Sequence, residues 1–493
     1  MQGYGEHYAR NLHTWICQYM TDNKLPLHRY GNCSTSVLDD EDIAQSIQLR
    51  LLEKASTSYV RTQDVVEIVA TPEIQDKLEY GAMRTTITVR TAQRWLRKLD
   101  WRYRRKSNGM YVDGHERDDV VEYRSTFVKR WAEYEKRMVT YNNDGNISTT
   151  PKGFPIPDGR FRLYLVTHDE STFYANDRRK TKWIHSSEKS APQRKGEGAS
   201  LMVSDFLTPD WGPLIHGNQA ARLIWKAGTN RDGWFGAEDL LKQVEIAIDL
   251  FEAKTNGWAV GLWMFDNAPS HQRRAADALS ARRMPKGPKA GWTHRKDGPK
   301  MRNGTFPDGS SQALYFPDDH PVMPGWFKGM EHIIREHNLW PANGLKAQCD
   351  GFKCPSGQAD CCCHRLLFTQ PDFIDQKSQL EEYITSRGHL CDYYPKYHCE
   401  LNFIEQYWGH AKMHYRTSPQ TSDINEMEQN VLRCLDNVSL LSIRRYANRS
   451  ARFISAYAQG LSGAEAVWAN RKYHGHRTLP PALAAELKRE ARK

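Results

Sequence analysis

Two apolar segments that each end on an aspartate are the strongest constraint on how this chain folds. Residues 162–167 lead into Asp169, and residues 258–265 lead into Asp266. Further elements are expected between them, in the order strand, strand, helix: residues 199–207, 221–228 and 237–254. Strands followed by a helix and a strand ending on an acid form an α/β pattern. We therefore predict an α/β core, a mixed sheet with flanking helices.

The chain ahead of this core has a helical pattern instead. Ile43, Ala44, Ile47 and Leu51 recur at helical spacing, and residues 63–70 and 89–99 predict two more helices. Thr88 is a candidate N-cap for the last of these. A long amphipathic helix is expected at residues 118–138, before a linker rich in Gly, Pro and Asn at residues 142–159.

Positive charge is concentrated on one of these predicted helices. The formal net charge of the chain is +10, and residues 84–106 hold nine Lys or Arg but only one acid. A helix that packs on one side and is cationic on the other suits the major groove of double-stranded DNA, and the basic arm that follows suits a minor groove. The alternative is a solvated basic helix in an ordinary bundle. The candidate DNA-binding residues are Arg90, Arg94, Arg97 and Lys98 on the helix and Arg102, Arg104 and Arg105 on the arm.

A third acid, Glu405, falls early in a predicted helix at residues 402–415. Three clustered carboxylates can hold two divalent cations for in-line phosphoryl chemistry, and oxygen ligands favour Mg²⁺ or Mn²⁺. On the helix face that carries Glu405, Lys412 and Arg416 are candidate phosphate-binding cations. Each acid taken alone also has a simpler interpretation as a cap, a turn or a solvated side chain. The hypothesis therefore depends on all three acids occurring in this order on these elements.

Three short motifs carry a resemblance to a known family. HDES at 168–171, FDNAPSH at 265–271 and ELNFIEQYW at 400–408 resemble the catalytic blocks of mariner-type DDE transposases. From about Asp39 to Arg477 the chain looks more closely like the multicopy DDE-superfamily endonuclease proteins of mushroom-forming fungi. The resemblance implies an RNase H-like core with Asp169, Asp266 and Glu405 as catalytic acids. It also implies a helix-turn-helix reader of transposon ends in the basic helical region.

The spacing of the last two acids departs from that family. Asp266 and Glu405 are 139 positions apart (405 − 266), whereas the better-known members have only a few dozen residues there. The surplus is expected to loop out as an insertion, which costs little because loop-closure entropy grows slowly with length. In the third motif Glu400 stands in place of Asp and Phe403 in place of Pro, and Glu400 is the rival third carboxylate.

The resemblance implies the activity and the layout of the chain. The activity would be cutting of phosphodiesters at transposon ends and transfer of the 3′-hydroxyl strand to target DNA, by a homodimer or larger assembly in the nucleus. The alternative is a catalytically silent, transposase-derived DNA-binding protein. The predicted regions are an N-terminal extension (1–38), a helix-turn-helix region (39–110), a connecting helix and linker (111–159), a catalytic core (160–420) with an insertion at about 272–395, and C-terminal helices with a basic tail (421–493).

Seven of the ten cysteines lie between Cys349 and Cys399, a concentration that needs an explanation. Thiolates and imidazoles at this density are typical of a structural zinc site, although the spacing lacks two clean C-x2-C pairs. The alternative is a set of small buried residues with reduced thiols. The candidate zinc ligands are Cys349, Cys354, Cys361, Cys363 and His364. A zinc-organised interaction module with an incidental acid pattern is a third hypothesis for the whole chain.

Other features limit the possible functions. The chain has no long apolar run, so no membrane span is expected, and it has no phosphate-cradling Gly-rich loop, so no nucleotide cofactor is expected. Asp205 follows the pattern of a strand acid, and we interpret it as a surface or edge residue. His168 is expected to serve in packing or in a supporting hydrogen bond rather than as a catalytic base.

Overall fold

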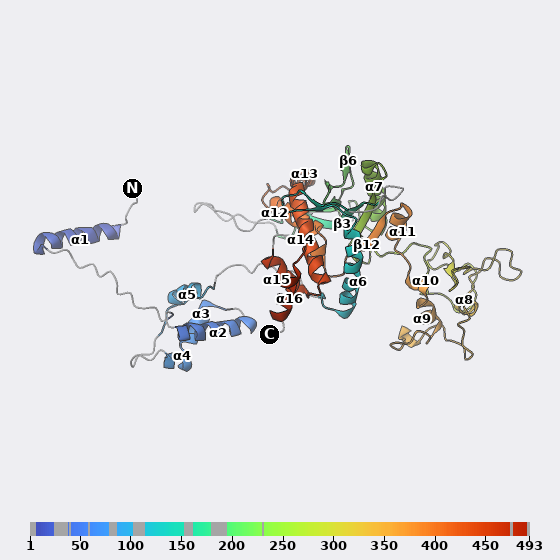
Figure 1. The fold of residues 1–493 in the computed structure, drawn as a ribbon, viewed down its shortest axis with the longest axis horizontal. Coiled ribbons are helices and arrows are strands. Elements are labelled where there is room, and N and C mark those ends of the chain that lie inside the picture. Colours follow the sequence, from blue (N-terminus) through green and yellow to red (C-terminus); the bar gives the residue numbers. More distant parts are fainter. Residues whose placement is uncertain are drawn as a thin grey trace. The chain divides into compact units, whose positions relative to one another are not determined.

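The computed structural model describes residues 6–23, 38, 41–57, 60–77, 86–101, 114–151, 161–178, 195–228, 231–473 and 477–490. The chain divides into two compact units, Met1–Gly109 and Met110–Lys493 (Figure 1). Among the described residues, no helix has the length and apolar content that crossing a membrane requires.

The N-terminal unit is helical, as predicted. Its helices are α1 (Glu6–Asp22), α2 (Glu41–Thr57), α3 (Thr62–Val69), α4 (Pro72–Lys77) and α5 (Val89–Lys98). Ile47, Val65 and Trp95 belong to the apolar core that joins α2, α3 and α5. The Thr88 hydroxyl accepts a hydrogen bond from the Thr91 amide at 3.2 Å, which confirms the predicted N-cap. The six-residue α4, which begins with proline, is too short for periodicity to reveal.

The second unit is built on one mixed sheet. Its main strands are β3 (Leu163–Tyr174), β4 (Ser200–Thr208), β9 (Val260–Phe265) and β12 (Leu390–Tyr393), with the short β5 (Gly212–Pro213) and β8 (Leu223–Trp225) beside β4. The order is β12-β9-β3-β4-β5. β12, β9 and β3 are parallel, whereas β4 runs antiparallel to β3, β5 and β8. A short hairpin of β6 (Ile215–His216) and β7 (Gln219–Ala220) extends from this region.

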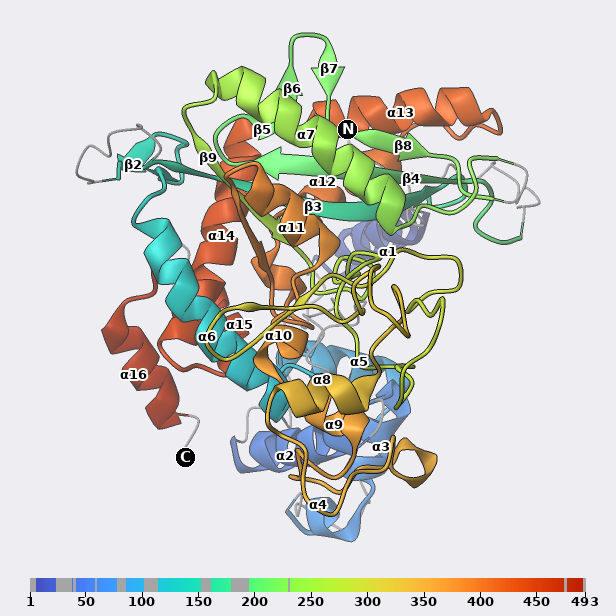
Figure 2. The ribbon, with the colours of Figure 1, turned by 90° about the vertical axis from the view of Figure 1, so that its right-hand side faces the viewer.

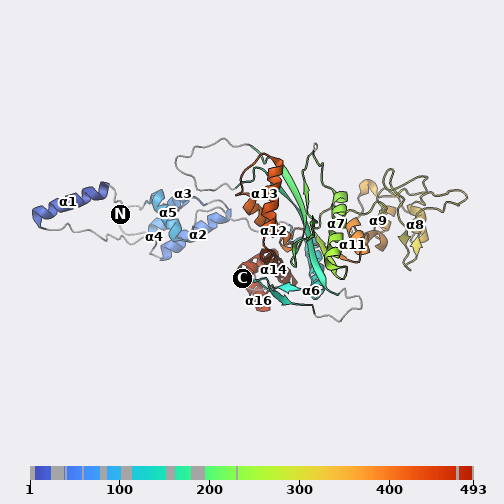
Figure 3. The same ribbon diagram turned by 90° about the horizontal axis from the view of Figure 1, so that it is seen from above.

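Side chains of β3 alternate between two apolar cores, one on each face of the sheet. Leu163 and Leu165 face the core that contains helix α12 (Ile404–Tyr415), whereas Tyr164 and Val166 face the core that contains helix α7 (Ala237–Thr255). Figure 3 shows the sheet edge-on between α12, α13 and α14 on one side and α7 and α11 on the other. A mixed sheet covered by helices on both faces fits the predicted RNase H-like core.

Helices from both ends of this unit cover the α12 face. They are α6 (Asp118–Glu135), α13 (Ile424–Asp436), α14 (Leu440–Ala458), α15 (Gly463–Lys472) and α16 (Pro481–Glu490). Phe127 of α6 and Phe453 of α14 are fully buried or nearly so within the core on this face. The α12 face is therefore the more thickly covered side of the sheet.

Part of the predicted linker is ordered structure. Residues 140–149 form a hairpin of β1 (Thr140–Tyr141) and β2 (Ile147–Thr149). Arg444 of α14 donates a hydrogen bond to the Gly145 carbonyl at 2.7 Å, and Arg445 donates to the Asn143 carbonyl at 2.8 Å. Composition alone missed this because the contacts come from helix α14, some three hundred residues further along the chain.

The predicted insertion at about 272–395 is too long at its C-terminal end. Helix α11 (Gln379–Ser386) and strand β12 belong to the sheet layer, because β12 pairs with β9. The amide of Gln379 donates a hydrogen bond to the carbonyl of Arg273 at 2.8 Å, so the inserted segment leaves and returns at one place. Distant parallel pairing gives no local signal, which explains the misplaced C-terminal boundary.

The inserted segment has a small apolar core of its own. Its regular elements are short: β10 (Gly304–Thr305), β11 (Ser311–Gln312), α8 (Met330–Glu336), α9 (Cys363–Phe368) and α10 (Pro371–Ile374). Met301, Phe327 and Ile333 are buried in this core. Met301, for example, is only 4% exposed. Figure 2 shows the short helices α8, α9 and α10 next to one another.

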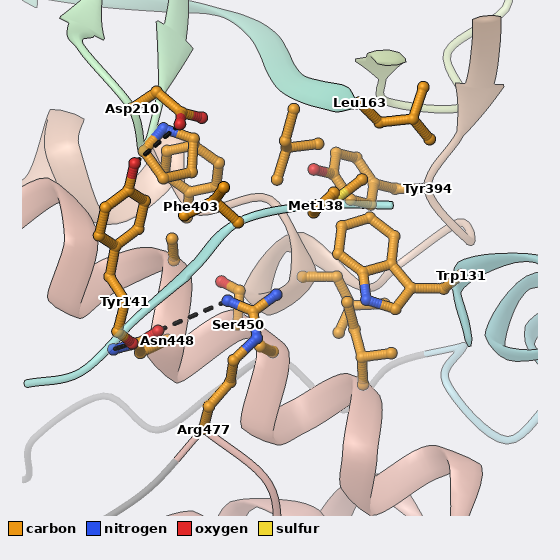
Figure 4. A pocket seen from close by; sticks show the side chains of 17 residues that line it. Trp131, Met138, Tyr141, Leu163, Asp210, Tyr394, Phe403, Asn448, Ser450 and Arg477 are labelled. Carbon is orange, nitrogen blue, oxygen red and sulfur yellow. Dashed lines mark hydrogen bonds between the residues drawn. The ribbon is translucent and has the colours of Figure 1, made fainter. Parts of the chain in front are cut away.

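A small internal cavity lies between the sheet, α6 and α14 (Figure 4). Its volume of about 20 Å³ is large enough for one water molecule and too small for a substrate. Trp131, Leu163 and Tyr394 form its apolar wall, and Asn448 with Arg477 forms the polar side. This cavity is therefore a packing feature and not a binding site.

Asp205 is a buried acid, and the interpretation of it as a surface or edge residue is wrong. It is fully buried on β4, and its carboxylate accepts a hydrogen bond from Arg222 at 2.6 Å. The Arg222 guanidinium also donates to Tyr407 of α12 and to Asp436 of α13, both at 2.8 Å. One buried arginine thus joins the sheet to two of the covering helices.

This network predicts a large stability loss when Arg222 is removed. Arg222→Met leaves the Asp205 carboxylate buried without its counter-charge, and we expect a loss of about 3–5 kcal/mol in the free energy of unfolding, measured in urea. Arg335→Met is the matched control: Arg335 is 54% exposed and paired with Glu331, and exposed pairs contribute about 0–1 kcal/mol. Equal losses in the two variants would contradict a structural role for the buried network.

Candidate active site

The pairing of β3 with β9 brings two of the predicted acids together. The two strands are parallel, and Thr167 lies opposite Met264 in the last pair of the ladder. Asp169 and Asp266 each follow two residues later, so they lie at equivalent positions along the two neighbouring strands. Because side chains alternate along a strand, both project from the face that carries Leu165 and Met264, which is the α12 face. Asp169 is half-buried, and the side chain of Asp266 is 49% exposed.

Helix α12 supplies the third acid from above this face. Ile404, Trp408 and Ala411 are buried against the sheet, and Glu405 lies in the first turn on an exposed side of the helix. Just before the helix, the Asn402 side chain accepts a hydrogen bond from the Thr167 hydroxyl and donates one to the His168 carbonyl at 3.3 Å. Asn402 therefore anchors the start of α12 to β3 immediately ahead of Asp169.

The three acids line a single open cavity of about 500 Å³. The rest of the wall comes from the turn after β9 and from the segment between β12 and α12: Asn267, Ala268, Pro269, Tyr394, Pro395, Lys396, Tyr397, His398, Cys399 and Asn402. The cavity thus lies where acids far apart in the sequence converge.

Burial and the charges of neighbouring acids raise the pKa values of two of the three acids, whereas His271 lowers the pKa of Asp266. Desolvation raises the pKa of Asp169 well above its ordinary value, and the neighbouring Glu405 carboxylate raises it further. Desolvation also raises the pKa of Glu405; the Lys412 ammonium opposes this shift and Asp266 adds to it. A raised pKa means that the ionised form of the carboxyl group is disfavoured. A cation bound beside these carboxylates would stabilise their ionised form.

His271 and Glu170 are site residues that the sequence analysis did not single out. His271 Nδ1 forms an ion pair with Asp266 Oδ1, and its Nε2 lies 3.5 Å from Glu170 Oε1. Burial alone would lower the pKa of His271, but hydrogen bonds to Asp266 and Glu170 raise it to about 10. A charged imidazole therefore orients Asp266. The available signal was the position of this histidine in the DNAPSH string, five residues after Asp266.

His168 faces the other side of the sheet. It is fully buried, and its Nε2 lies 2.7 Å from the Ser204 hydroxyl, which in turn donates to Gln243 of α7. Burial lowers the pKa of His168 to about 4, so the ring is neutral near pH 7. This arrangement agrees with the expectation of a packing and hydrogen-bonding role.

Glu400, the rival third carboxylate, lies outside the cavity wall. Its side chain is 6% exposed and is held 2.7 Å from His398 Nδ1. The Tyr457 hydroxyl donates to the same carboxylate at 2.7 Å, and His115 lies 3.9 Å away. Glu400 therefore belongs to a buried cluster that ties the start of α12 to α14.

The structure distinguishes the basic residues predicted to contact DNA. Arg90, Arg94, Arg97 and Lys98 are all exposed on α5, while Arg102, Arg104 and Arg105 lie outside the described residues. Lys412 is half-buried with its ammonium 5.4 Å from the ring centre of Phe173. Arg416 donates to Asp177 at 2.9 Å. Neither residue lines the cavity, so both lie beside the acids rather than among them.

The predicted zinc set is corrected by the structure. Cys349, Cys354 and Cys361 do converge, but the fourth thiol of the cluster is Cys362. Cys363 is fully buried in the apolar core of the inserted segment, and His364 Nδ1 lies 2.7 Å from the Ala281 carbonyl. Adjacent residues at the start of a helix point in different directions, and the sequence alone could not show which cysteine faces the cluster.

Comparisons with known proteins give matches among solved structures only. No family model and no curated protein matches the chain. The Mos1 transposase paired-end complex with left transposon end aligns over 96% of this chain and 90% of that chain, with 10% identity and a TM-score of 0.42. The Mos1 mariner paired end complex with Mn aligns over 92% and 88%, with 10% identity and a TM-score of 0.41. The function proposed for this chain rests on its own carboxylates and not on these similarities.

The raised pKa of Asp169 predicts how stability depends on pH. A folded-state pKa above the unfolded value means that the folded chain binds the proton more tightly. The contribution of Asp169 to stability is therefore greatest below its unfolded pKa of about 3.9 and falls as pH rises through the folded-state pKa. We expect Asp169→Asn to flatten this fall in thermal melts recorded without divalent cations.

The same thermal melts, repeated with a divalent cation, test whether Asp169 binds metal. Mn²⁺ should raise the melting temperature more at about pH 8 than at about pH 5, because protons compete for Asp169. Asp169→Asn should abolish most of the increase. Asp318→Asn is the control, because Asp318 is 91% exposed and outside the cavity. An undiminished Mn²⁺ effect in Asp169→Asn would show that the ion binds elsewhere.

Proposed function

We propose that this chain is a DNA transposase or endonuclease of the DDE type. It would cut phosphodiesters at transposon ends and transfer the 3′-hydroxyl strand to target DNA, with Asp169, Asp266 and Glu405 as the catalytic acids. One observation carries the proposal: carboxylates from two adjacent parallel strands and from a helix packed on the same face line one open cavity.

The donor set fits a pair of hard divalent cations. All three candidate ligands are carboxylates. Desolvation and the Glu405 charge raise the pKa of Asp169, and a bound Mg²⁺ or Mn²⁺ would favour its charged form. When bound, two such ions activate a water or a 3′-hydroxyl and stabilise the leaving oxygen. The cavity is open enough to admit the phosphodiester between the acids.

Neighbouring residues keep the three acids in place. His271 neutralises and orients Asp266 from one side, and the hydrogen bonds of Asn402 fix the distance between β3 and the first turn of α12. Lys412, on the same helix as Glu405, and Arg416, which caps the C-terminal end of that helix, add positive charge beside the cavity, where a DNA backbone would approach. Arg222 pairs with the buried Asp205, so that acid does not add its charge to the site.

The N-terminal unit would supply the affinity for double-stranded DNA. Its helix α5 exposes Arg90, Arg94, Arg97 and Lys98 while burying Ala92 and Trp95, the division expected of a recognition helix in a helix-turn-helix. Joining two transposon ends requires more than one copy of the chain, so we propose a homodimer or larger assembly on DNA. Chromosomal DNA as the substrate would place that assembly in the nucleus.

The catalytic proposal predicts the loss of metal-dependent nicking in acid variants. Asp266→Asn and Glu405→Gln should each lower the rate of Mn²⁺- or Mg²⁺-dependent nicking of DNA that carries the element's own ends by at least about 100-fold, because a lost ligand removes several kcal/mol of transition-state stabilisation. Asp318→Asn should cut at the wild-type rate. DNA binding, measured by fluorescence anisotropy, should persist in all three variants.

The same experiment tests the alternative of a catalytically silent DNA-binding protein. That alternative predicts DNA binding without nicking in the wild type under every divalent cation. Nicking that is equal in wild type and Asp266→Asn would contradict the proposed mechanism, because some other group would then be cutting.

The DNA-binding proposal predicts a change in salt dependence. Each phosphate contact removed should reduce the slope of log K against log salt by about 1, so Arg90→Ala combined with Arg94→Ala should reduce it by about 2 if both bind phosphate. Lys136→Ala is the control, since Lys136 is 66% exposed and pairs with Glu133 in the other unit. Unchanged affinity and slope in the double variant would remove α5 from the interface.

A further inference from the structure

Four thiols of the inserted segment converge on one point. Cys349 and Cys354 flank a short 3-10 turn (Asp350–Phe352), and Cys361 and Cys362 immediately precede α9. Their four sulfur atoms all lie within 4.8 Å of one another. All four are free cysteines, so no disulfide accounts for the convergence.

The sulfur spacing matches a tetrahedral metal site. A zinc–sulfur bond is about 2.3 Å long, and the edge of a tetrahedron with that radius is about 3.8 Å. Cys354 Sγ and Cys362 Sγ are 3.9 Å apart. A disulfide would need about 2.05 Å, so the sulfur atoms are at the separation expected across a shared ion and not across a covalent bond.

We propose that Cys349, Cys354, Cys361 and Cys362 bind one structural zinc ion. Four thiolates are a soft donor set, which favours zinc over the hard cations proposed for the carboxylates. Four protein ligands also fill a tetrahedral shell and leave no position for a reacting water. None of the four cysteines lines the cavity that holds Asp169, Asp266 and Glu405. The zinc therefore serves the fold of the inserted segment, and the inference does not depend on the proposed function.

The backbone already holds the two halves of the site together. The amide of Cys363 donates to the Lys346 carbonyl at 3.0 Å, and the amide of His364 donates to the Ala347 carbonyl at 3.1 Å. These bonds place the chain leading to Cys349 beside the start of α9. Cys363 points away into the apolar core, which orients Cys361 and Cys362 on the other side of that backbone.

The need for an ion follows from the construction of the segment. Its helices α8, α9 and α10 have seven, six and four residues, and its two strands have two residues each. Such short elements contribute few backbone hydrogen bonds and little stability of their own. A structural zinc site contributes folding free energy directly, because the unfolded chain has no preformed set of ligands.

Metal analysis of the full-length chain tests the proposal. Protein purified under reducing conditions without chelators should contain about one zinc per chain, and Cys354→Ser or Cys362→Ser should reduce this to less than about one fifth. Cys363→Ala and Cys391→Ala are the matched controls and should retain zinc. The Cys363 control also separates this ligand set from the one that the sequence predicted.

A second measurement keeps the test decisive if the serine variants fail to fold. Replacing the metal of the wild-type chain with Co²⁺ should produce the sulfur-to-cobalt charge-transfer absorption of a four-thiolate site. Absence of both zinc and this absorption would overturn the proposal. So would iron in place of zinc, zinc retained in Cys354→Ser and Cys362→Ser, or cysteine pairs that resist alkylation because they are disulfide-bonded.

Discussion

The parallel pairing of β3 with β9 is the constraint on which the candidate site depends. The hydrogen-bonded ladder fixes the register of the two strands, and in that register Asp169 and Asp266 occupy equivalent positions on neighbouring strands. A slip of one residue would send one of the two carboxylates to the opposite face, toward α7, because alternate residues face opposite ways. The apolar cores on both faces prevent such a slip, since it would expose buried Leu165 or Val166 to the wrong neighbours. The packing of the sheet therefore determines the chemistry at its end.

Charge is distributed so that only some of the acids at this end of the sheet remain repulsive. Asp205 lies directly opposite Asp169 in the antiparallel ladder, yet Arg222 holds its carboxylate. Asp266 is paired with His271, whereas desolvation and Glu405 raise the pKa of Asp169. Under the proposed function, a cation in the cavity would meet one acid oriented by a charged imidazole and two acids whose pKa values burial raises. This asymmetry is a property of the whole surrounding network.

Local patterns predicted the main elements, and long-range contacts explain what they missed. Apolar runs ending on Asp169 and Asp266 and helical spacing around Glu405, together with three short motifs that resemble a known family, predicted these acids as one set, and all three line one cavity. The burial of Asp205 could not be predicted from the sequence, because it depends on an ion pair with Arg222, which lies outside β4. The place of β12 in the sheet depends on pairing with β9, more than a hundred residues earlier. The choice between Cys362 and Cys363 depended on side-chain direction, which composition does not encode.

The closed ends of the inserted segment have a consequence for how this chain can change over time. A backbone hydrogen bond joins Gln379 to Arg273, and Arg302 of the inserted segment is paired with Glu382 of α11, so the segment is attached close to where its two ends meet the sheet layer. The segment has its own apolar core and its own cluster of thiols. Insertions, deletions or replacement of this segment would therefore leave the register of β3 and β9 unchanged. The sequence of the inserted segment can thus change without moving the three carboxylates relative to one another.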